Sequence, residues 1–397
     1  MKKLLIYLVI LILFTITILF LILSSVGIET SQFNKFITKK VSQTKNINLK
    51  LDTIKFKLDP RELSLFLETQ SPKVSLRNIS VPVQNIKVYV DFLSLFKSQP
   101  KIKKINIVSK ELDILEINKL SLIIKPSNFK SLVNNKIKKG KLNTEIEIFL
   151  NDEGIFENFI AKGKVKDLKI IITNDLSLTK TSLGFFADKN DVLLKNIFGN
   201  FEDIKISDGD IKLNFENGIK LSSNFKSSID YNEKKLEKVY KYLKKYNFVN
   251  QVKYFKADLI NNFTINFDKT YKIQDYNYSI NGNLEKTKID LLKPVRSAYL
   301  FDKIKNIYIS NFKIQTSFKS KKLEIEGAGK YSFDDKNFNN INLKNEIIRD
   351  TINLGVDFDF QNSFKLDLIN YKKSKDTIAK IDLDITTNKN ITKINRL

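Results

Sequence analysis

Apolar and polar residues alternate through most of the chain, from about residue 47 to residue 385. The pattern is clearest in the segments 144–150, 210–216 and 262–268. Successive side chains of a β-strand point to opposite faces of a sheet, so each segment has one apolar face and one polar face. The pattern therefore predicts a mainly β fold in which something apolar must cover one face of the sheet.

The predicted strands of the first third of the chain are separated by turn residues such as Pro60, Pro72 and Pro100. These strands span residues 47–58, 63–69, 73–83, 85–92, 101–108, 111–117 and 119–125. A second series is expected from Lys141 to Lys226, and strands resume from Lys253 to Ile385. The last residues, 386–397, are polar and are expected to be frayed.

A helical periodicity interrupts the strands at residues 232–247, where Leu236, Val239, Tyr240 and Leu243 recur at helical spacing. The apolar stripe of this helix is expected to pack against the sheet. Shorter helices are expected over residues 30–44 (capped by Thr30 or Ser31), 93–97, 126–134 and 293–300.

The segment from Leu4 to Leu23 carries no charge. At about 1.5 Å per residue it spans about 30 Å, the thickness of a bilayer core. Lys2 and Lys3 precede it, which favours a cytoplasmic N-terminus. A cleaved signal peptide is the alternative, but this run exceeds the roughly 7–15 apolar residues of such peptides. The sequence therefore predicts a single-pass anchor in the inner (cytoplasmic) membrane, with the body in the periplasm.

Composition excludes several kinds of chemistry. The chain contains no His and no Cys, which removes the usual general base, thiol nucleophiles and the commonest metal ligands. Motifs for phosphate-binding loops, dinucleotide binding, nucleophile elbows and zinc proteases are also absent from the sequence. We therefore expect no enzymatic activity, no cofactor and no metal.

The formal net charge is +24, and it is carried almost entirely by Lys spread along the polar faces of the predicted strands. A solvated polar surface is the simplest interpretation. Attraction to anionic lipid headgroups is the alternative. Nucleic-acid binding is not expected, because Arg residues are few and the charge forms no patch along the sequence.

Three stretches of the first 125 residues carry a resemblance to a known family. They are the apolar helix followed by Gly27–Thr30, residues 54–60 leading into 63–69, and residues 86–96 followed by Ile102, Ile105 and Ile107. These stretches resemble the N-terminal module of the AsmA-like family, the group that includes TamB and YhdP. The resemblance implies bridge-like lipid transfer, in which a long twisted antiparallel sheet curls into an open groove, a β-taco, for phospholipid tails.

The resulting division of the chain is a cytoplasmic tip and transmembrane anchor (1–27), an AsmA-type module (28–125) and a continuing β-groove with the helix near 232–247 (126–397). Apolar residues of the alternating segments are predicted to line the groove. They are Ile146, Ile148, Ile211, Leu213, Phe215, Phe263, Ile265, Phe267, Phe358 and Phe360. The alternative is that they meet across an ordinary closed core.

The predicted function is binding or conduction of phospholipid along the groove, as part of outer-membrane lipid homeostasis, with a possible outer-membrane or periplasmic partner protein. A non-conducting periplasmic scaffold or assembly factor for outer-membrane proteins, acting through exposed sheet edges, is the main alternative. An outer-membrane barrel fits less well, because an apolar helix of this length is retained in the inner membrane. A soluble adhesin-like fibre is a further alternative.

Overall fold

The structure is a computed structural model that describes residues 2–31, 34, 38, 47–51, 53–60, 64–91, 94, 101–122, 134–173, 176–216, 218–243, 250–268, 270, 272–295, 300, 303–319, 321–375, 377–388 and 391–397. The chain divides into two compact units, Met1–Leu194 and Lys195–Leu397. The described residues are mainly β and contribute to one large antiparallel sheet and two small sheets. The expected mainly β, antiparallel fold is confirmed.

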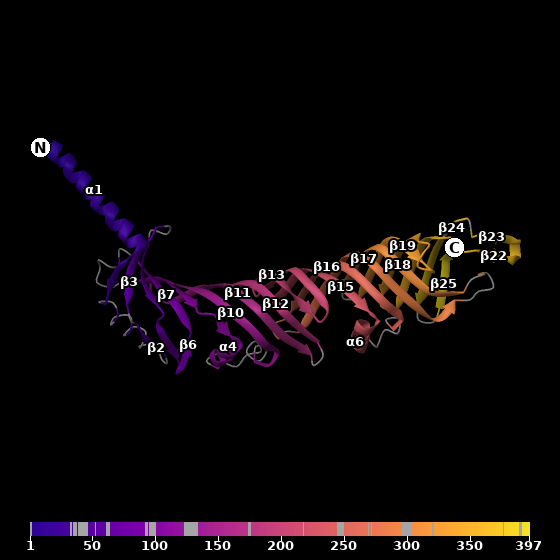
Figure 1. Cartoon of the computed structure of the whole chain (residues 1–397), viewed down its shortest axis with the longest axis horizontal. Helices are drawn as coiled ribbons and strands as arrows, with labels where there is room; N and C mark the ends of the chain where they lie inside the picture. Colours follow the sequence, from indigo (N-terminus) through magenta and orange to yellow (C-terminus); the bar gives the residue numbers. More distant parts are fainter. Residues whose placement is uncertain are drawn as a thin grey trace. The chain divides into compact units, whose positions relative to one another are not determined.

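The first unit begins with helix α1 (Lys2–Ser25), which leads into the strands (Figure 1). Its remaining elements are β1 (Ile28–Thr30), β2 (Ile47–Lys50), β3 (Ile54–Asp59), β4 (Ser64–Gln70), β5 (Lys73–Leu76), β6 (Ile79–Val81), β7 (Val83–Val90), β8 (Ile102–Ser109), β9 (Leu112–Asp113), α4 (Ile114–Ser121), β10 (Ile137–Leu150), β11 (Phe156–Thr173) and β12 (Leu176–Ala187). The division point between the units falls within β13 (Asp191–Phe201).

The second unit is a meander of long strands with one α-helix among the described residues (Figure 1). Its elements are β14 (Ile204–Asn214), β15 (Ile219–Asn232), α6 (Glu233–Leu243), β16 (Val252–Phe267), β17 (Ile273–Val295), β18 (Ile304–Lys319), β19 (Lys322–Ser332), β20 (Asn339–Ile348), β21 (Thr351–Phe360), β22 (Phe364–Leu366), the 3-10 helix η2 (Asp367–Ile369), β23 (Tyr371–Lys373), β24 (Ala379–Asn388) and β25 (Ile391–Arg396). From β14 to β21 each strand pairs with the next along the chain, and β24 then joins β21.

Helix α1 contains the membrane-span candidate. Its stretch Leu4–Ser25 has a mean hydropathy of 3.2 and is not buried against the rest of the described chain. Gly27 follows the end of the helix; its N–H donates to the Ile22 carbonyl at 2.8 Å, and its φ is +76°. A residue in this left-handed conformation after a helix is usually glycine, because it has no Cβ. The N-terminal helix is therefore long and apolar enough to cross a membrane, as predicted.

The core of the first unit lies between the large sheet and a second, small sheet. Strands β2, β5 and β6 form this three-stranded sheet, and the two-residue loop of the β5–β6 hairpin is Arg77–Asn78. Both loop residues have positive φ, +49° and +65°, as a type I′ turn requires. The prediction of a single strand over 73–83 is therefore wrong, and so is the prediction of one strand over 47–58, which forms β2 and β3.

The prediction of strands over 111–117 and 119–125 is wrong for the described residues. Only Leu112 and Asp113 are extended, and Ile114–Ser121 forms helix α4. Asp113 caps the helix by accepting the Leu115 and Glu116 N–H groups, while the Glu116 carboxylate accepts the Asp113 N–H. This reciprocal capping box satisfies N–H groups that a helix start leaves unpaired, and it outweighs the local alternation.

Two predictions for the last third are also corrected. Residues 293–295 continue β17 instead of starting a helix. Pro294 is tolerated there because the pairing of β17 with β18 is irregular between Asp290 and Val295, where no ladder donor is needed. The end is not frayed: β24 runs to Asn388, and β25 pairs with it, reinforced by a 2.7 Å ion pair between Arg396 and Asp382.

The predicted helix over 232–247 is confirmed by α6, which places Leu236 in a buried position at 5% exposure and packs against β15 and β16. The Tyr240 hydroxyl donates to the Val252 carbonyl, so this tyrosine serves packing. Residues 244–249 lie outside the described part. So do most of 30–44 and 93–97 and nearly all of 126–134, although Thr30 belongs to β1.

Candidate functional site

One face of the second unit's sheet collects apolar side chains from successive strands. Leu213 of β14 pairs with Leu221 of β15, which pairs with Ile265 of β16. Residues paired directly across antiparallel strands lie on the same face. A second row contains Ile341 of β20, Phe358 of β21 and Ile381 of β24. Here the alternation along each strand has become a continuous apolar surface.

The register places seven of the ten predicted residues on this apolar face. Phe263 belongs to a row of directly paired residues that continues through Tyr278, Phe318, Leu323 and Ile347 to Ile352. Ile352 and Phe358 are an even number of residues apart in β21, so they lie on the same face of the sheet. The seven residues are Ile211, Leu213, Phe263, Ile265, Phe267, Phe358 and Phe360. The opposite face carries the polar partners, such as Lys344 and Asn342 of β20.

Phe358 and Phe360 belong to an aromatic cluster. The ring centroids of Phe358 and Tyr331 are 5.9 Å apart, and those of Phe360 and Phe364 are also 5.9 Å apart, both in edge-to-face geometry. Phe333 lies 6.4 Å from Phe360. Phe360 is only 6% exposed, so at this end of the face neighbouring rings already cover it, as in an ordinary core. Burial and the nearby Asp359 raise the pKa of Tyr331.

Phe215 lies apart from these rows. It follows the last residue of β14, Asn214, and is 41% exposed. Phe263, in contrast, is half-buried and makes an edge-to-face contact with Phe225, their centroids 6.4 Å apart. The structure therefore brings Phe263 into the apolar face and leaves Phe215 beyond the end of its strand.

The remaining two predicted residues, Ile146 and Ile148, lie in the first unit. Ile146 of β10 pairs with Ile107 of β8, and Ile148 pairs with Ile105. Ile107 and Ile105 pair in turn with Ile86 and Val88 of β7. This row continues an apolar face of the first unit's strands and leads to a cavity.

The cavity has a volume of about 260 Å³ and lies between the large sheet and the small β2–β5–β6 sheet. Its lining is apolar except for Thr69. The lining residues are Leu49, Leu51, Ile54, Leu67, Thr69, Val74, Ile86, Val88, Ile105 and Ile107. Walls of this kind favour apolar ligands over water, because they offer few hydrogen-bond partners.

The cavity was not predicted from the sequence, although part of its wall was visible there. Alternation in residues 54–58, 65–69 and 86–90 indicates which side chains share a face. It does not indicate that Leu49 of β2 and Val74 of β5 fold across that face.

The opposite face of the same strands is charged and tightly paired. Lys57 Nζ lies 2.7 Å from Glu68 Oε2, and Asn85 Nδ2 donates to Glu68 Oε1. Burial opposes ionisation of Glu68, but these hydrogen bonds outweigh it and lower its pKa below 4.5. Among the described residues, no group of three or more carboxylates is placed to hold a metal ion.

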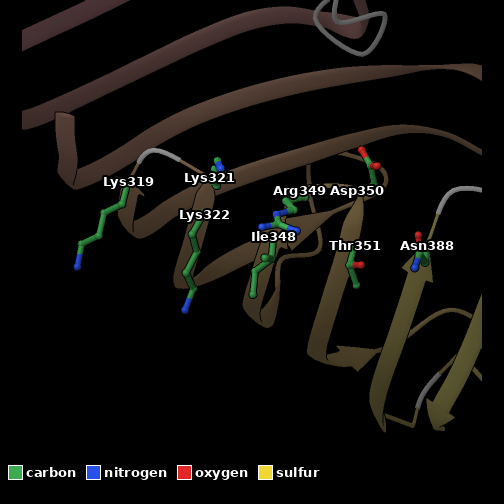
Figure 2. A pocket seen from close by; sticks show the side chains of 8 residues that line it. All are labelled: Lys319, Lys321, Lys322, Ile348, Arg349, Asp350, Thr351 and Asn388. Atoms are coloured by element: carbon green, nitrogen blue, oxygen red, sulfur yellow. The ribbon is translucent and has the colours of Figure 1, made fainter. Parts of the chain in front are cut away.

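A second hollow, of about 770 Å³, lies at the turns of the second unit's sheet (Figure 2). It is open, and seven of its eight lining residues have polar or charged side chains. Its lining residues are Lys319, Lys321, Lys322, Ile348, Arg349, Asp350, Thr351 and Asn388. Four of these eight side chains are cationic, so the local charge favours an anion.

No protein-family model, curated protein or solved structure matches the chain. The resemblance to the AsmA-like family therefore stays a prediction. The functional argument depends on the apolar face, the cavity and the membrane-span candidate.

Proposed function

We propose that the protein is a membrane-anchored lipid-binding protein that holds phospholipid acyl chains against the apolar face of its sheet. The observation that carries this proposal is the register, which collects apolar side chains from β14 through β24 on one face and polar side chains on the other. Apolar surface of this extent needs an apolar partner in water.

Few of the described elements of the second unit cover the apolar face of its sheet. Outside the large sheet, the structure describes α6, η2 and the two-stranded sheet β22–β23 in this unit. The aromatic cluster covers Phe360, whereas Phe318 and Ile352 on the same face remain 37% and 39% exposed. Acyl chains would remove such side chains from water without requiring a second protein layer.

The anchor supports a lipid over other apolar ligands. Only Val26 and Gly27 separate α1 from β1. Strand β1 pairs with β3, whose Ile54 lines the apolar cavity. The first apolar site is therefore close in sequence to the segment that would sit in the bilayer. We further propose that Lys2 and Lys3 keep the N-terminus in the cytoplasm and that the body binds or conducts phospholipid in the periplasm for the outer membrane.

The test is photocrosslinking of the full-length chain in a bacterial host with two membranes. Benzoylphenylalanine replaces Phe263 or Leu343 on the apolar face, and the matched controls carry it at Thr264 or Asn342, the neighbouring positions on the polar face. Mass spectrometry of the purified protein should detect phospholipid adducts at the first pair and not at the second. Absence of lipid adducts at Phe263 and Leu343, or equal yields on both faces, would overturn the proposal.

A second experiment tests whether lipid binding depends on the apolar character of this face. Phe263→Asp puts a charge on the apolar face, while Thr264→Asp puts it on the polar face of the same strand. With the crosslinker at Leu343, the first variant should lower the lipid yield and the second should leave it unchanged. Circular dichroism should show the same strand content in both variants.

One observation favours the alternative of a non-conducting scaffold for outer-membrane proteins. Every residue of β25, Ile391–Arg396, is exposed, and an exposed strand can pair with a strand of another protein. Crosslinker at Lys393 distinguishes the two functions. A defined protein adduct there, without lipid adducts on the apolar face, would support the scaffold.

A further inference from the structure

The second hollow, with its four cationic side chains, is formed by a row of directly paired residues at the ends of neighbouring strands in the second unit. Lys319 of β18 pairs with Lys322 of β19, which pairs with Ile348 of β20. Ile348 pairs with Thr351 of β21, and Thr351 pairs with Asn388 of β24. Figure 2 shows Lys319 and Lys322 extending in the same direction from neighbouring strands. The turns add Lys321, Arg349 and Asp350 to the lining.

The cations of this hollow differ in how they are paired. Lys322 lies 2.6 Å from both Glu324 and Glu346, and these carboxylates raise its pKa. Lys319, Lys321 and Arg349 are exposed and form no ion pair within the part of the chain that the structure describes. Their charge is therefore available to a ligand, while Lys322 is held in place by its own partners.

Exposed apolar side chains lie at the same strand ends, on the face of the sheet opposite to Lys319 and Lys322. The next register row, on the apolar face, contains Phe318, Leu323, Ile347 and Ile352. Phe318 adjoins Lys319 in the chain and is 37% exposed, and Ile352 adjoins Thr351 and is 39% exposed. Lys321 and Arg349 lie in the turns, at the rim between the two faces. A ligand that crosses this rim would place an anionic group on the cations and apolar chains on the apolar face, which matches the two chemical parts of an anionic amphiphile.

We propose that Lys319, Lys321 and Arg349 bind the phosphate of an anionic phospholipid headgroup whose acyl chains lie on the neighbouring apolar face. This inference rests on the proposed function and adds a headgroup preference to it. Lysine and arginine form charge-assisted hydrogen bonds with phosphate oxygens, and arginine can do so through two parallel N–H groups. The Thr351 hydroxyl and the Asn388 amide add neutral polar groups to the same hollow.

The test uses the full-length chain in an uncharged detergent. Native mass spectrometry compares the binding of phosphatidylglycerol and phosphatidylcholine that carry identical acyl chains. The test variant is Lys319→Gln/Lys321→Gln/Arg349→Gln. The matched control, Lys313→Gln/Lys330→Gln/Lys380→Gln, removes the same charge from exposed positions elsewhere on the second unit's sheet.

The wild type and the control variant should prefer phosphatidylglycerol by about tenfold, and the test variant should lose most of this preference while still binding phosphatidylcholine. Equal binding of both lipids by the wild type would overturn the headgroup site and leave the proposed function intact. An equal loss in the control variant would assign the preference to overall charge and overturn the site. Displacement of phosphatidylglycerol by an equal concentration of inorganic phosphate would also overturn it, because the ligand would be free phosphate. Binding of neither lipid by the wild type would instead count against the proposed function.

Discussion

Glu68 shows how a carboxylate becomes part of the protein interior. It is 7% exposed on β4, an uncommon environment for an acidic residue. Lys57 forms an ion pair with one of its carboxylate oxygens, and Asn85 donates a hydrogen bond to the other. Because these partners hydrogen-bond to the charged form, they lower the pKa of Glu68 below 4.5 even though burial acts in the opposite direction. Glu68 should therefore stabilise the fold only while it is ionised.

Glu68→Gln should lower the melting temperature of the full chain at pH 7, with a loss of about 1–3 kcal/mol in the free energy of unfolding. The folded-state pKa lies below the ordinary value of 4.5, so the stabilisation is present above about pH 4.5 and is lost as the pH falls through the lower folded-state pKa. Thermal melts followed by circular dichroism at pH 7 and at decreasing acidic pH test this. The difference in melting temperature between the wild type and Glu68→Gln should become smaller as the pH is lowered.

The control for this prediction is Glu153→Gln, at an exposed turn position, which should change the melting temperature little at any pH. If the difference in melting temperature between the wild type and Glu68→Gln stayed constant from pH 7 to pH 3, the stabilisation by Glu68 would not depend on its ionisation, and the prediction would be wrong.

Gly327 is a residue whose missing side chain matters. It lies on β19 beneath Phe312, which is 4% exposed. A Cβ at this position would collide with the Phe312 ring and approach the Lys313 carbonyl oxygen. Packing of this aromatic side chain against the backbone therefore requires glycine.

Gly327→Ala should destabilise the second unit by about 1–3 kcal/mol, because overpacking displaces the ring. Gly355→Ala is the matched control in a neighbouring region of the sheet, since its Cβ would meet only the Lys344 carbonyl oxygen, at 3.8 Å. Chemical denaturation monitored by circular dichroism compares the two variants. Equal free energies of unfolding for the Gly327→Ala and Gly355→Ala variants would show that the Phe312 ring can move without loss of stability.

At the scale of elements, α4 demonstrates that a cap can outweigh alternation. Residues 111–117 and 119–125 contain apolar residues at close spacing and are predicted as strands. The Asp113 and Glu116 side chains nevertheless satisfy the first N–H groups of a helix. The eight-residue helix is short for independent stability, so its cap and its packing against β9 and β10 determine its presence.

Asp113→Ala should destabilise α4 by about 1 kcal/mol. Hydrogen–deuterium exchange should become faster for the amides of Leu115 and Glu116, which donate to Asp113 Oδ1. Asp113→Asn keeps an acceptor oxygen and should retain most of the protection. Unchanged exchange in the alanine variant would show that tertiary contacts alone hold the helix.

At the scale of the whole molecule, α1 sets the location of everything that follows it. The Leu4–Ser25 stretch is uncharged, has a mean hydropathy of 3.2 and is not buried against the described chain. In water such a helix would expose a large apolar surface, which a bilayer removes. Inserted in a bilayer, α1 would hold the lipid-binding surfaces proposed above next to a membrane.

Replacement of residues 4–23 by a Gly/Ser-rich sequence should move the full chain from the carbonate-resistant membrane fraction to the soluble fraction. A control with the same apolar residues in scrambled order should stay in the membrane, because insertion depends on hydropathy and length. Membrane retention of the Gly/Ser variant after carbonate extraction would show that another part of the chain is embedded.

Much of the fold follows from short-range features that a sequence displays directly. Alternation predicts the strands because side chains on a strand point to alternate faces, and seven predicted residues accordingly share one face of the second unit. Helices α1 and α6 follow from an uninterrupted apolar run and from helical spacing around Leu236. In each case the determining interaction lies within one segment.

The sequence by itself thus determined the membrane-span candidate, the mainly β fold and the separation of apolar from polar faces. Tertiary structure alone decided what covers each face. Leu49 and Val74 line one cavity together with Ile105 and Ile107, and rings from other parts of the second unit bury Phe360. It also gathered Lys319, Arg349 and Asn388 around one hollow. The physical reason is that alternation is a property of one strand, whereas cover and charge clustering depend on which strands meet, and those strands are far apart along the chain.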